Sequence, residues 1–448
     1  MNLSSVLEDD LVARRQARTS PGLLGDFTWT FLGNGIYALC QWGIIIILAK
    51  LVTAEALGQY SLSQAILGPI LMLAGFSLRL AVASDLKNQF TNREYFGFRL
   101  FTLAVGLLTA LLVAFSTARS SAVIAMVGIV GLTQAAELVS DMLYGLHQRG
   151  GNLVRPALSM ILKGPIGLVA LTTGILWGHS VLAGLAGLTA TRAAVLVLYD
   201  LTGALGGRDP ALGMGRAYFP WRRHLELYRV VCFVGLLALF SSLISTIPRY
   251  FIEFYLGSRE LGVFAAITSL TAIGLMPVAA LGVASFVRLA RAFTDARPRD
   301  VLKILGVLVG LSFVIGAGGV ISAYVAGPQI LTLLFRREYA ARTDLLLLTM
   351  IMGAVTFLSA SLGVSLMAAR IFKRQTILLA VVGIFEALSC WALVPRMGLR
   401  GAVIACLGAA TLQLLGNVYI LIDHLARHIP PEQLQSPRLD PQAGTWPP

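Results

Sequence analysis

Residues 121–146 read SAVIAMVGIVGLTQAAELVSDMLYGL, a stretch that is apolar enough to cross a lipid bilayer and yet contains two carboxylates. A helix that spans the ~30 Å hydrocarbon core needs ~20 mostly apolar residues. Polar residues recur here at steps of three and four, which places them on one helix face: Gln134, Glu137, Asp141, Tyr144 and Gln148. Because a carboxylate facing lipid near the membrane centre costs roughly 2.5 kcal/mol or more, this face must meet a cavity or another helix.

The rest of the chain repeats such apolar stretches and predicts an all-α polytopic membrane protein. Hydrophobic residues make up 57% and charged residues 13% of the 448 residues, against about 45–50% and roughly 25% in soluble proteins. This composition excludes a cytosolic enzyme, a disordered chain and a coiled coil. About twelve transmembrane helices are predicted, at about 28–50, 62–83, 98–118, 121–146, 156–177, 180–201, 228–250, 261–284, 303–325, 343–367, 376–395 and 400–424.

The distribution of Lys and Arg predicts the orientation of these helices. Most basic residues fall in alternate loops that start from the N-terminal segment, so both termini are expected inside. The net charge of +13 therefore indicates membrane topology rather than nucleic-acid binding. The predicted organisation is a cytoplasmic N-terminal segment, two six-helix bundles separated by a cytoplasmic linker, and a Pro-rich cytoplasmic tail: 1–27, 28–201, 202–227, 228–424 and 425–448.

A weak internal repeat relates the two predicted bundles. Leu57-Gly58-Gln59-Tyr60 follows the first span, and Leu261-Gly262-Val263-Phe264 follows the seventh. Both place Leu-Gly-x-aromatic at the outer start of the next helix. Duplicated halves of this kind commonly build transporters that bind their substrate between the halves.

Other predicted spans also contain polar residues. Asn34, Tyr37 and Gln41 share helical spacing in the first span, and Pro248 is expected to kink the seventh. Charged residues lie within or beside spans at Arg79, Lys163, Arg192, Arg249 and Glu386. Two interpretations stay open for these residues and for Glu137 and Asp141: structural ion pairs and hydrogen bonds between helices, or the lining of a transport cavity. Arg79 has a third, because a long basic side chain near the inner end of a helix can reach the membrane surface.

Several functions are excluded by missing motifs. The chain has no G-x-x-x-x-G-K-[ST], which excludes ATP hydrolysis by a P-loop. Its four cysteines lack the spacing of a zinc site or a disulfide framework. An enzyme would need a catalytic loop or domain, and the largest predicted outer loop, about 326–342, has neither paired carboxylates nor His. We expect a secondary transporter without a catalytic site, metal site or cofactor, coupled to H⁺ or Na⁺.

Short motifs along the chain occur in an order similar to that of a known family: Gly33 to Ala38 with Gln41-Trp42, Glu55 to Tyr60, Leu78-Arg79 with Asp85, Glu137 with Ser140-Asp141, Tyr144-Gly145 with Gln148-Arg149, Lys163-Gly164-Pro165, Pro248 to Glu253, Leu261 to Ala266, and Leu334-Phe335 with Glu338-Tyr339. Over about 28–424 they resemble the bacterial oligosaccharide and polysaccharide flippases, O-antigen flippases included, of the multidrug/oligosaccharidyl-lipid/polysaccharide exporter superfamily. The resemblance implies two six-helix bundles around a central, often cationic cavity. It also implies a flippase in the bacterial inner membrane that moves undecaprenyl-pyrophosphate-linked oligosaccharide to the outer leaflet for lipopolysaccharide or exopolysaccharide biosynthesis.

These expectations give each candidate residue a role. The substrate-binding candidates are Arg79, Lys163, Arg192, Arg249, Asn34, Tyr37, Gln41 and Tyr144. The ion-coupling candidates are Glu137, Asp141 and Glu386. The expected partners are the lipid-linked oligosaccharide, membrane lipids, and a polysaccharide polymerase with its assembly machinery, with no nucleic acid. A multidrug or metabolite antiporter of the same superfamily is the alternative, because it would share the fold and the cation coupling.

Overall fold

The computed structural model describes residues 23–75, 78–85, 89–117, 120–205, 221–295 and 297–428. All regular secondary structure in these residues is helical. The helices are α2 (Leu23–Leu51), α3 (Ala54–Gly75), α4 (Leu78–Ser84), α5 (Asn92–Thr117), α6 (Ser121–Arg149), α7 (Val154–Gly178), α8 (Val181–Val195), η1 (Leu196–Leu201), α9 (Thr202–Leu205), α10 (Trp221–Leu256), α11 (Ser258–Thr294), α12 (Pro298–Leu334), η3 (Arg337–Arg342), α13 (Thr343–Ala368), α14 (Phe372–Met397) and α15 (Leu399–His428).

Eleven of the described helical spans are long and apolar enough to cross a membrane. The all-α polytopic prediction is therefore confirmed. The second predicted span differs, because residues 62–83 are not one helix: α3 starts at Ala54, and Leu78–Ser84 form the separate helix α4. The early start of α3 has a local cause. Thr53 Oγ1 accepts the Ala56 amide at 3.3 Å, and Glu55 places a negative charge in the first turn, where the helix dipole favours it.

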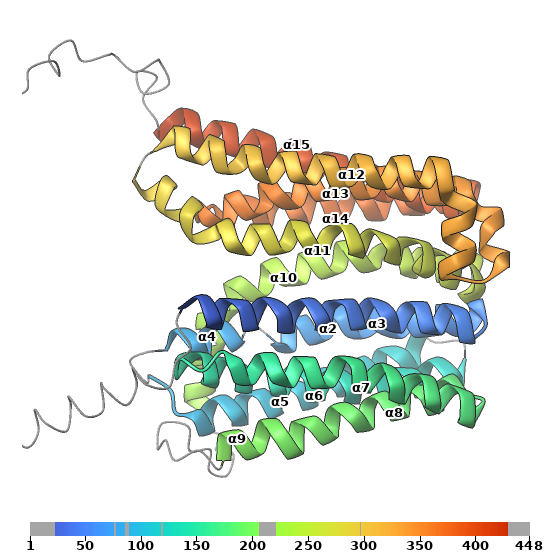
Figure 1. Cartoon of the computed structure of the whole chain (residues 1–448), viewed down its shortest axis with the longest axis horizontal. Coiled ribbons are helices and arrows are strands. Elements are labelled where there is room, and N and C mark those ends of the chain that lie inside the picture. The colour runs from blue at the N-terminus through green and yellow to red at the C-terminus, as the bar shows by residue number, and fades with distance from the viewer. Residues whose placement is uncertain are drawn as a thin grey trace, which may run out of the picture.

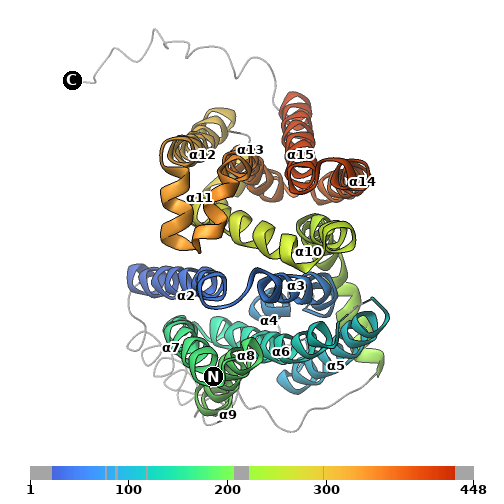
Figure 2. The same ribbon diagram turned by 90° about the vertical axis from the view of Figure 1, so that its right-hand side faces the viewer.

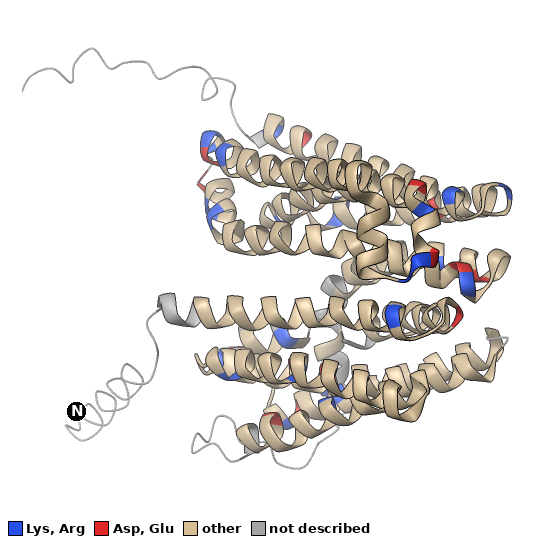
Figure 3. Cartoon of the chain, turned by 45° about the vertical axis from the view of Figure 1, so that its right-hand side comes forward, with Lys and Arg blue, Asp and Glu red and all other residues tan. Residues whose placement is uncertain are grey.

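The helices form two groups that lie side by side (Figure 1). One group contains α2 to α9 and the other α10 to α15, and in the end-on view α2 and α3 face α10 and α11 (Figure 2). The start of α10 also reaches the first group, where Leu227 joins a buried cluster with Leu78 and Val82. Charged residues lie mostly near helix ends, as expected for spanning helices (Figure 3). Residues 206–220 of the predicted linker, 1–22 and 429–448 lie outside the described residues.

The two groups meet at one end and diverge toward the end where α2 begins and α15 ends (Figure 1). At the closed end, α3 and α11 cross backbone against backbone. A side-chain carbon on Gly58 would overlap the Ser258 carbonyl, and one on Gly262 would overlap the Ala54 carbonyl. The glycines of the internal repeat therefore let α3 and α11 cross this closely. With the predicted inside termini, this closed end is the outer end.

Replacing either crossing glycine tests this contact. Gly58→Ala or Gly262→Ala should destabilise the protein by roughly 1–3 kcal/mol, because an added methyl group meets backbone that cannot repack. Gly35→Ala is the matched control, since nothing lies within 4 Å of a side-chain carbon built there. Thermal unfolding of the solubilised protein measures the difference. Midpoints for Gly58→Ala and Gly35→Ala that coincide would refute a tight crossing.

Candidate functional site

Helix α6 is the hub of the polar contacts in the first group of helices. The polar residues of its stripe bond to several other helices. Glu137 forms an ion pair with Arg192 of α8 at 2.9 Å, and Asp141 forms one with Arg79 of α4 at 3.2 Å. Three further contacts of α6 reach α3, α7 and α5: Gln134 with Gln64, Ser140 and Tyr144 with Lys163, and Arg149 with Asn92. The stripe is thus a seam between helices.

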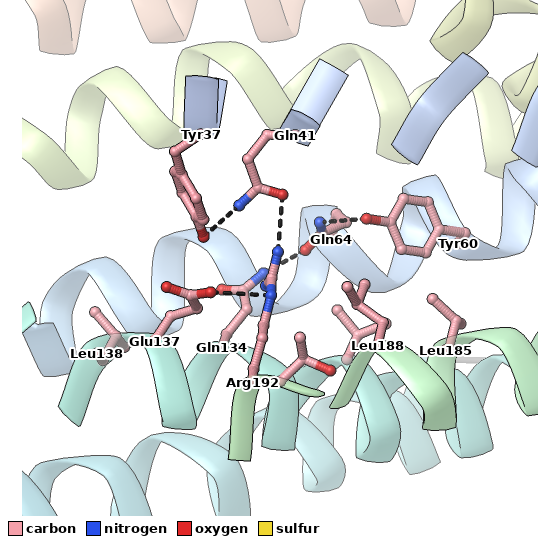
Figure 4. Close-up of a pocket in the computed structure, with 12 residues that line it drawn as sticks. Tyr37, Gln41, Tyr60, Gln64, Gln134, Glu137, Leu138, Leu185, Leu188 and Arg192 are labelled. Atoms are coloured by element: carbon pink, nitrogen blue, oxygen red, sulfur yellow. Dashed lines mark hydrogen bonds and ion pairs between the residues drawn. The ribbon is translucent and has the colours of Figure 1, made fainter. Parts of the chain in front are cut away.

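Part of the same stripe also lines a cavity of about 220 Å³ within the first group (Figure 4). Arg192 lies at its centre and donates from Nη2 to Gln41 Oε1 at 2.8 Å, while Gln41 Nε2 donates to the Tyr37 hydroxyl at 2.7 Å. Tyr60 and Gln64 continue the polar lining toward α3. Glu137 retains 21% of its side-chain exposure beside Arg192. Gln134 and Glu137 thus bond to neighbouring helices and also line a cavity, and a transport role for that cavity stays a prediction.

A second cavity, of about 790 Å³, lies between the two groups. Gln41, Tyr60 and Gln64 line both cavities, so the two adjoin. Most of the lining side chains are apolar or carry a hydroxyl or amide group. From the first group the polar lining residues are Gln41, Tyr60, Ser61 and Gln64, and from the second they are Ser241, Ser245, Arg249, Thr268, Ser269, Thr271, Thr356, Glu386, Cys406 and Gln413.

Arg249 and Glu386 are the charged residues of this central cavity, and neither has an ion-pair partner among the described residues. Arg249 is half-buried, and its Nε has no hydrogen-bond partner there. Glu386 is 2% exposed, its Oε2 is similarly unpartnered, and its other contact is the Cys406 thiol. In the first group Glu137, Asp141 and Asp200 are paired with Arg192, Arg79 and Lys163, whereas Arg99 of α5, which is 1% exposed, has no ion-pair partner among the described residues. Burying an unpaired charge costs free energy. Both charged residues of the central cavity are therefore candidates for binding a transported ligand or ion.

The remaining candidates lie outside both cavities. Lys163 is 1% exposed and donates to Asp200 at 2.8 Å, to Ser140 at 2.5 Å and to Tyr144 at 3.0 Å. Tyr144 is buried against Ser159 at 2.7 Å, and the exposed Asn34 donates to the Thr30 carbonyl in its own helix. Arg79 also contacts Gln148 at 3.2 Å. The transport roles of these residues stay predictions.

Asp200 is the buried charge that sequence reasoning missed. It lies in the π-helix η1 at the end of the sixth span and forms the ion pair that neutralises Lys163. The predicted set of intramembrane carboxylates had three members, Glu137, Asp141 and Glu386. With Asp200 included, every basic residue of the first group's interior that was predicted for transport has an acidic partner. The available signal was its position at the last turn of an apolar stretch.

Asp85 lies between α4 and α5, outside the membrane-spanning helices, and closes the connecting turn. Its carboxylate accepts the Gln89 amide at 2.9 Å, the Phe90 amide at 3.1 Å and the Tyr95 hydroxyl at 3.0 Å. Burial alone would raise the pKa of Asp85, but these hydrogen bonds outweigh it and hold the pKa below its usual value.

The lowered pKa gives a signed pH dependence. A carboxylate with a depressed folded-state pKa contributes stability above its unfolded pKa of about 3.9 and loses it as the pH falls through the folded value. Asp85→Asn should therefore lower the thermal midpoint at pH 7, and the difference from the unaltered chain should shrink below about pH 4. Thermal unfolding between pH 3 and pH 8 measures it. A pH-independent difference would show that the charge of Asp85 contributes nothing.

Comparison with solved structures defines the class of fold. The chain superimposes on the inward-facing conformation of a multidrug resistance MATE family transporter of the MOP superfamily, with a TM-score of 0.73 and 16% identity, over 89% of this chain and 99% of that chain. It also superimposes on the lipid II flippase MurJ in an inward closed conformation, with a TM-score of 0.67 and 11% identity, over 90% of this chain and 88% of that chain. The protein is thus a multi-pass membrane protein with the fold of MOP-superfamily transporters.

One relative is similar to this chain in sequence over most of its length. The chain is 22% identical over 392 residues to the capsular polysaccharide biosynthesis protein CapF of Staphylococcus aureus. The aligned region covers 85% of this chain and 95% of that protein. No family model matches the chain. The relative and the two structures confirm the resemblance that the motifs predicted, to the polysaccharide flippases of this superfamily.

Proposed function

We propose that this protein is a flippase for undecaprenyl-pyrophosphate-linked oligosaccharide, moving it from the inner to the outer leaflet of the bacterial inner membrane for surface or exported polysaccharide. The observation that carries the proposal is the central cavity between the two helix groups, in which Arg249 is a guanidinium without an ion-pair partner among the described residues. A guanidinium suits phosphate or pyrophosphate, because its planar donors bind two oxygens at once.

The rest of the lining suits a saccharide. The cavity volume of about 790 Å³ falls within the roughly 300–1,000 Å³ typical of ligand sites. Its serine, threonine, glutamine and tyrosine side chains offer donors and acceptors to sugar hydroxyl groups. Entry of the saccharide from the side, between the halves, would leave the polyprenyl tail in lipid, where an apolar chain is most stable.

The coupling ion would act at the carboxylate that the fold leaves unneutralised. Glu137 and Asp141 already have arginine partners, at 2.9 Å and 3.2 Å. Glu386 has none, and it lines the same cavity as Arg249. A buried carboxylate binds H⁺ or a cation to offset the loss of solvation. Glu386 is therefore the strongest of the three ion-coupling candidates, and alternating access by rocking of the halves would expose it to each side in turn.

The alternative is a cation-coupled multidrug or metabolite antiporter. The similarity to the MATE transporter supports it, because the fold is shared. The hydroxyl and amide side chains among the lining residues favour a saccharide, because sugar hydroxyl groups need hydrogen-bond donors and acceptors.

The arginine of the cavity provides the first test. Arg249→Gln should reduce flipping of lipid-linked oligosaccharide in proteoliposomes by about 10-fold to 100-fold, because a charged hydrogen-bonded contact worth ~1.5–3 kcal/mol is lost. Arg249→Lys should recover only part of the rate, since an ammonium cannot bind phosphate in the bidentate manner. Arg297→Gln, at an exposed position, is the matched control. Equal rates for Arg249→Gln and Arg297→Gln would reject a phosphate site at Arg249.

The buried carboxylate provides the second test. Glu386→Gln should leave the protein folded and abolish the response of flipping to an imposed H⁺ or Na⁺ gradient, because an amide cannot exchange either ion. The measurement is the flipping rate with and without each gradient. Glu338→Gln, at an exposed position of η3, should retain the response. A gradient response that survives in Glu386→Gln would remove Glu386 from the coupling mechanism.

A further inference from the structure

Helix α3 contains an internal proline, and the gap it causes is filled from the other helix group. Proline has no N–H, so Pro69 cannot donate to the carbonyl of Ala65, four residues earlier. The hydroxyl of Tyr250, on α10, donates to that carbonyl at 2.6 Å. The backbone acceptor that Pro69 leaves without a helical donor is thus satisfied across the boundary between the two groups.

This contact is costly to lose. Ala65 is 0% exposed, and a buried carbonyl without a donor carries its full desolvation penalty. The bilayer core offers no water to replace the donor. The two helices also pack closely nearby: a side-chain carbon built on Gly68 would lie 3.3 Å from Ser242 Oγ of α10. The register of α3 against α10 is therefore set by a hydrogen bond as well as by packing.

The residue next to Tyr250 is Arg249, the cavity cation. Pro248 precedes it and cannot donate to the Ile244 carbonyl, so the α10 backbone has lost an internal hydrogen bond just before Arg249. Arg249 has no ion pair among the described residues that would hold it. Its electrostatic neighbours are Tyr60 of α3, Tyr250 itself and Cys406. The turn that carries Arg249 is thus tied to α3 through Tyr250.

We propose that Tyr250 is a positioning residue. By filling the gap left by Pro69, its hydroxyl fixes the α10 turn against α3 and holds Arg249 beside the cavity wall that Tyr60 and Gln64 form. The proposal rests on the proposed function, because it assigns Tyr250 its role through the phosphate site at Arg249. The proposal predicts an interaction between two substitutions. A residue with an N–H at position 69 supplies the missing donor to the Ala65 carbonyl, so the Tyr250 hydroxyl is no longer needed to satisfy that carbonyl.

The test is a double-mutant cycle on the full chain with Tyr250→Phe, Pro69→Ala and both together. Tyr255→Phe is the matched control, since it removes a hydroxyl from the same helix and keeps the ring contacts with Phe251 and Phe254. The first measurement is the thermal midpoint of the solubilised protein. Tyr250→Phe should lower it by about 2 °C in the unaltered chain and by less than half as much in the Pro69→Ala background. An equal decrease in both backgrounds, or none in either, overturns the bridge.

The second measurement separates positioning from stability alone. The probe is undecaprenyl pyrophosphate, and its dissociation constant is measured with each variant in nanodiscs at a temperature where all are folded. Tyr250→Phe should raise the dissociation constant about fivefold in the unaltered chain and leave it unchanged in the Pro69→Ala background. Tyr255→Phe should bind the probe as the unaltered chain does. A dissociation constant that Tyr250→Phe leaves unchanged refutes the positioning role, even if the midpoints couple.

Arg249→Gln distinguishes the two proposals from one another. If it weakens probe binding, the phosphate site stands and the Tyr250 variants decide the positioning role. If Arg249→Gln binds the probe as tightly as the unaltered chain, the proposed phosphate site is wrong, and the positioning role is overturned with it. The thermal cycle still decides whether the bridge between Tyr250 and Ala65 exists, because it does not depend on any ligand.

Discussion

The cost of a charge that faces lipid organises the first half of this protein. Helix α6 carries two carboxylates through an apolar environment, and each is neutralised by an arginine of another helix, Arg192 of α8 and Arg79 of α4. Further polar side chains of α6 reach α3, α7 and α5 through hydrogen bonds. One helix thus fixes the positions of five neighbours, because every alternative placement would leave a polar group without a partner.

The second half follows the opposite rule at the cavity. Arg249 and Glu386 line the space between the halves without ion-pair partners among the described residues. The two have opposite charges, but they do not pair with each other. A transporter must bind and release its cargo, and charges already joined within the fold contribute little to that. The unpaired charges that line the cavity between the halves are therefore the candidates for transport, whereas the ion pairs of α6 hold the first half together.

Much of the fold could be predicted from the sequence. Apolar length indicated the spans, and the steps of three and four on α6 indicated a polar face. The internal repeat contained Gly58 and Gly262, but the crossing of α3 and α11 at these glycines emerged only from the structure. Pairing could not be predicted, because it depends on which helices are neighbours. Asp200 was missed for this reason, and so was the hydrogen bond from Tyr250 to the carbonyl that Pro69 leaves free. The separate helix α4 was also missed, since apolar content continues from α3 into it.

The central claim is that the cavity between the halves carries a lipid-linked saccharide across the membrane. The most direct measurement is the leaflet in which undecaprenyl-pyrophosphate-linked oligosaccharide accumulates when the gene is deleted from its host, with any paralogue also removed. The account predicts accumulation in the inner leaflet and loss of the exported polysaccharide, both restored by the unaltered gene. Normal export of the polysaccharide in the deletion strain would contradict it.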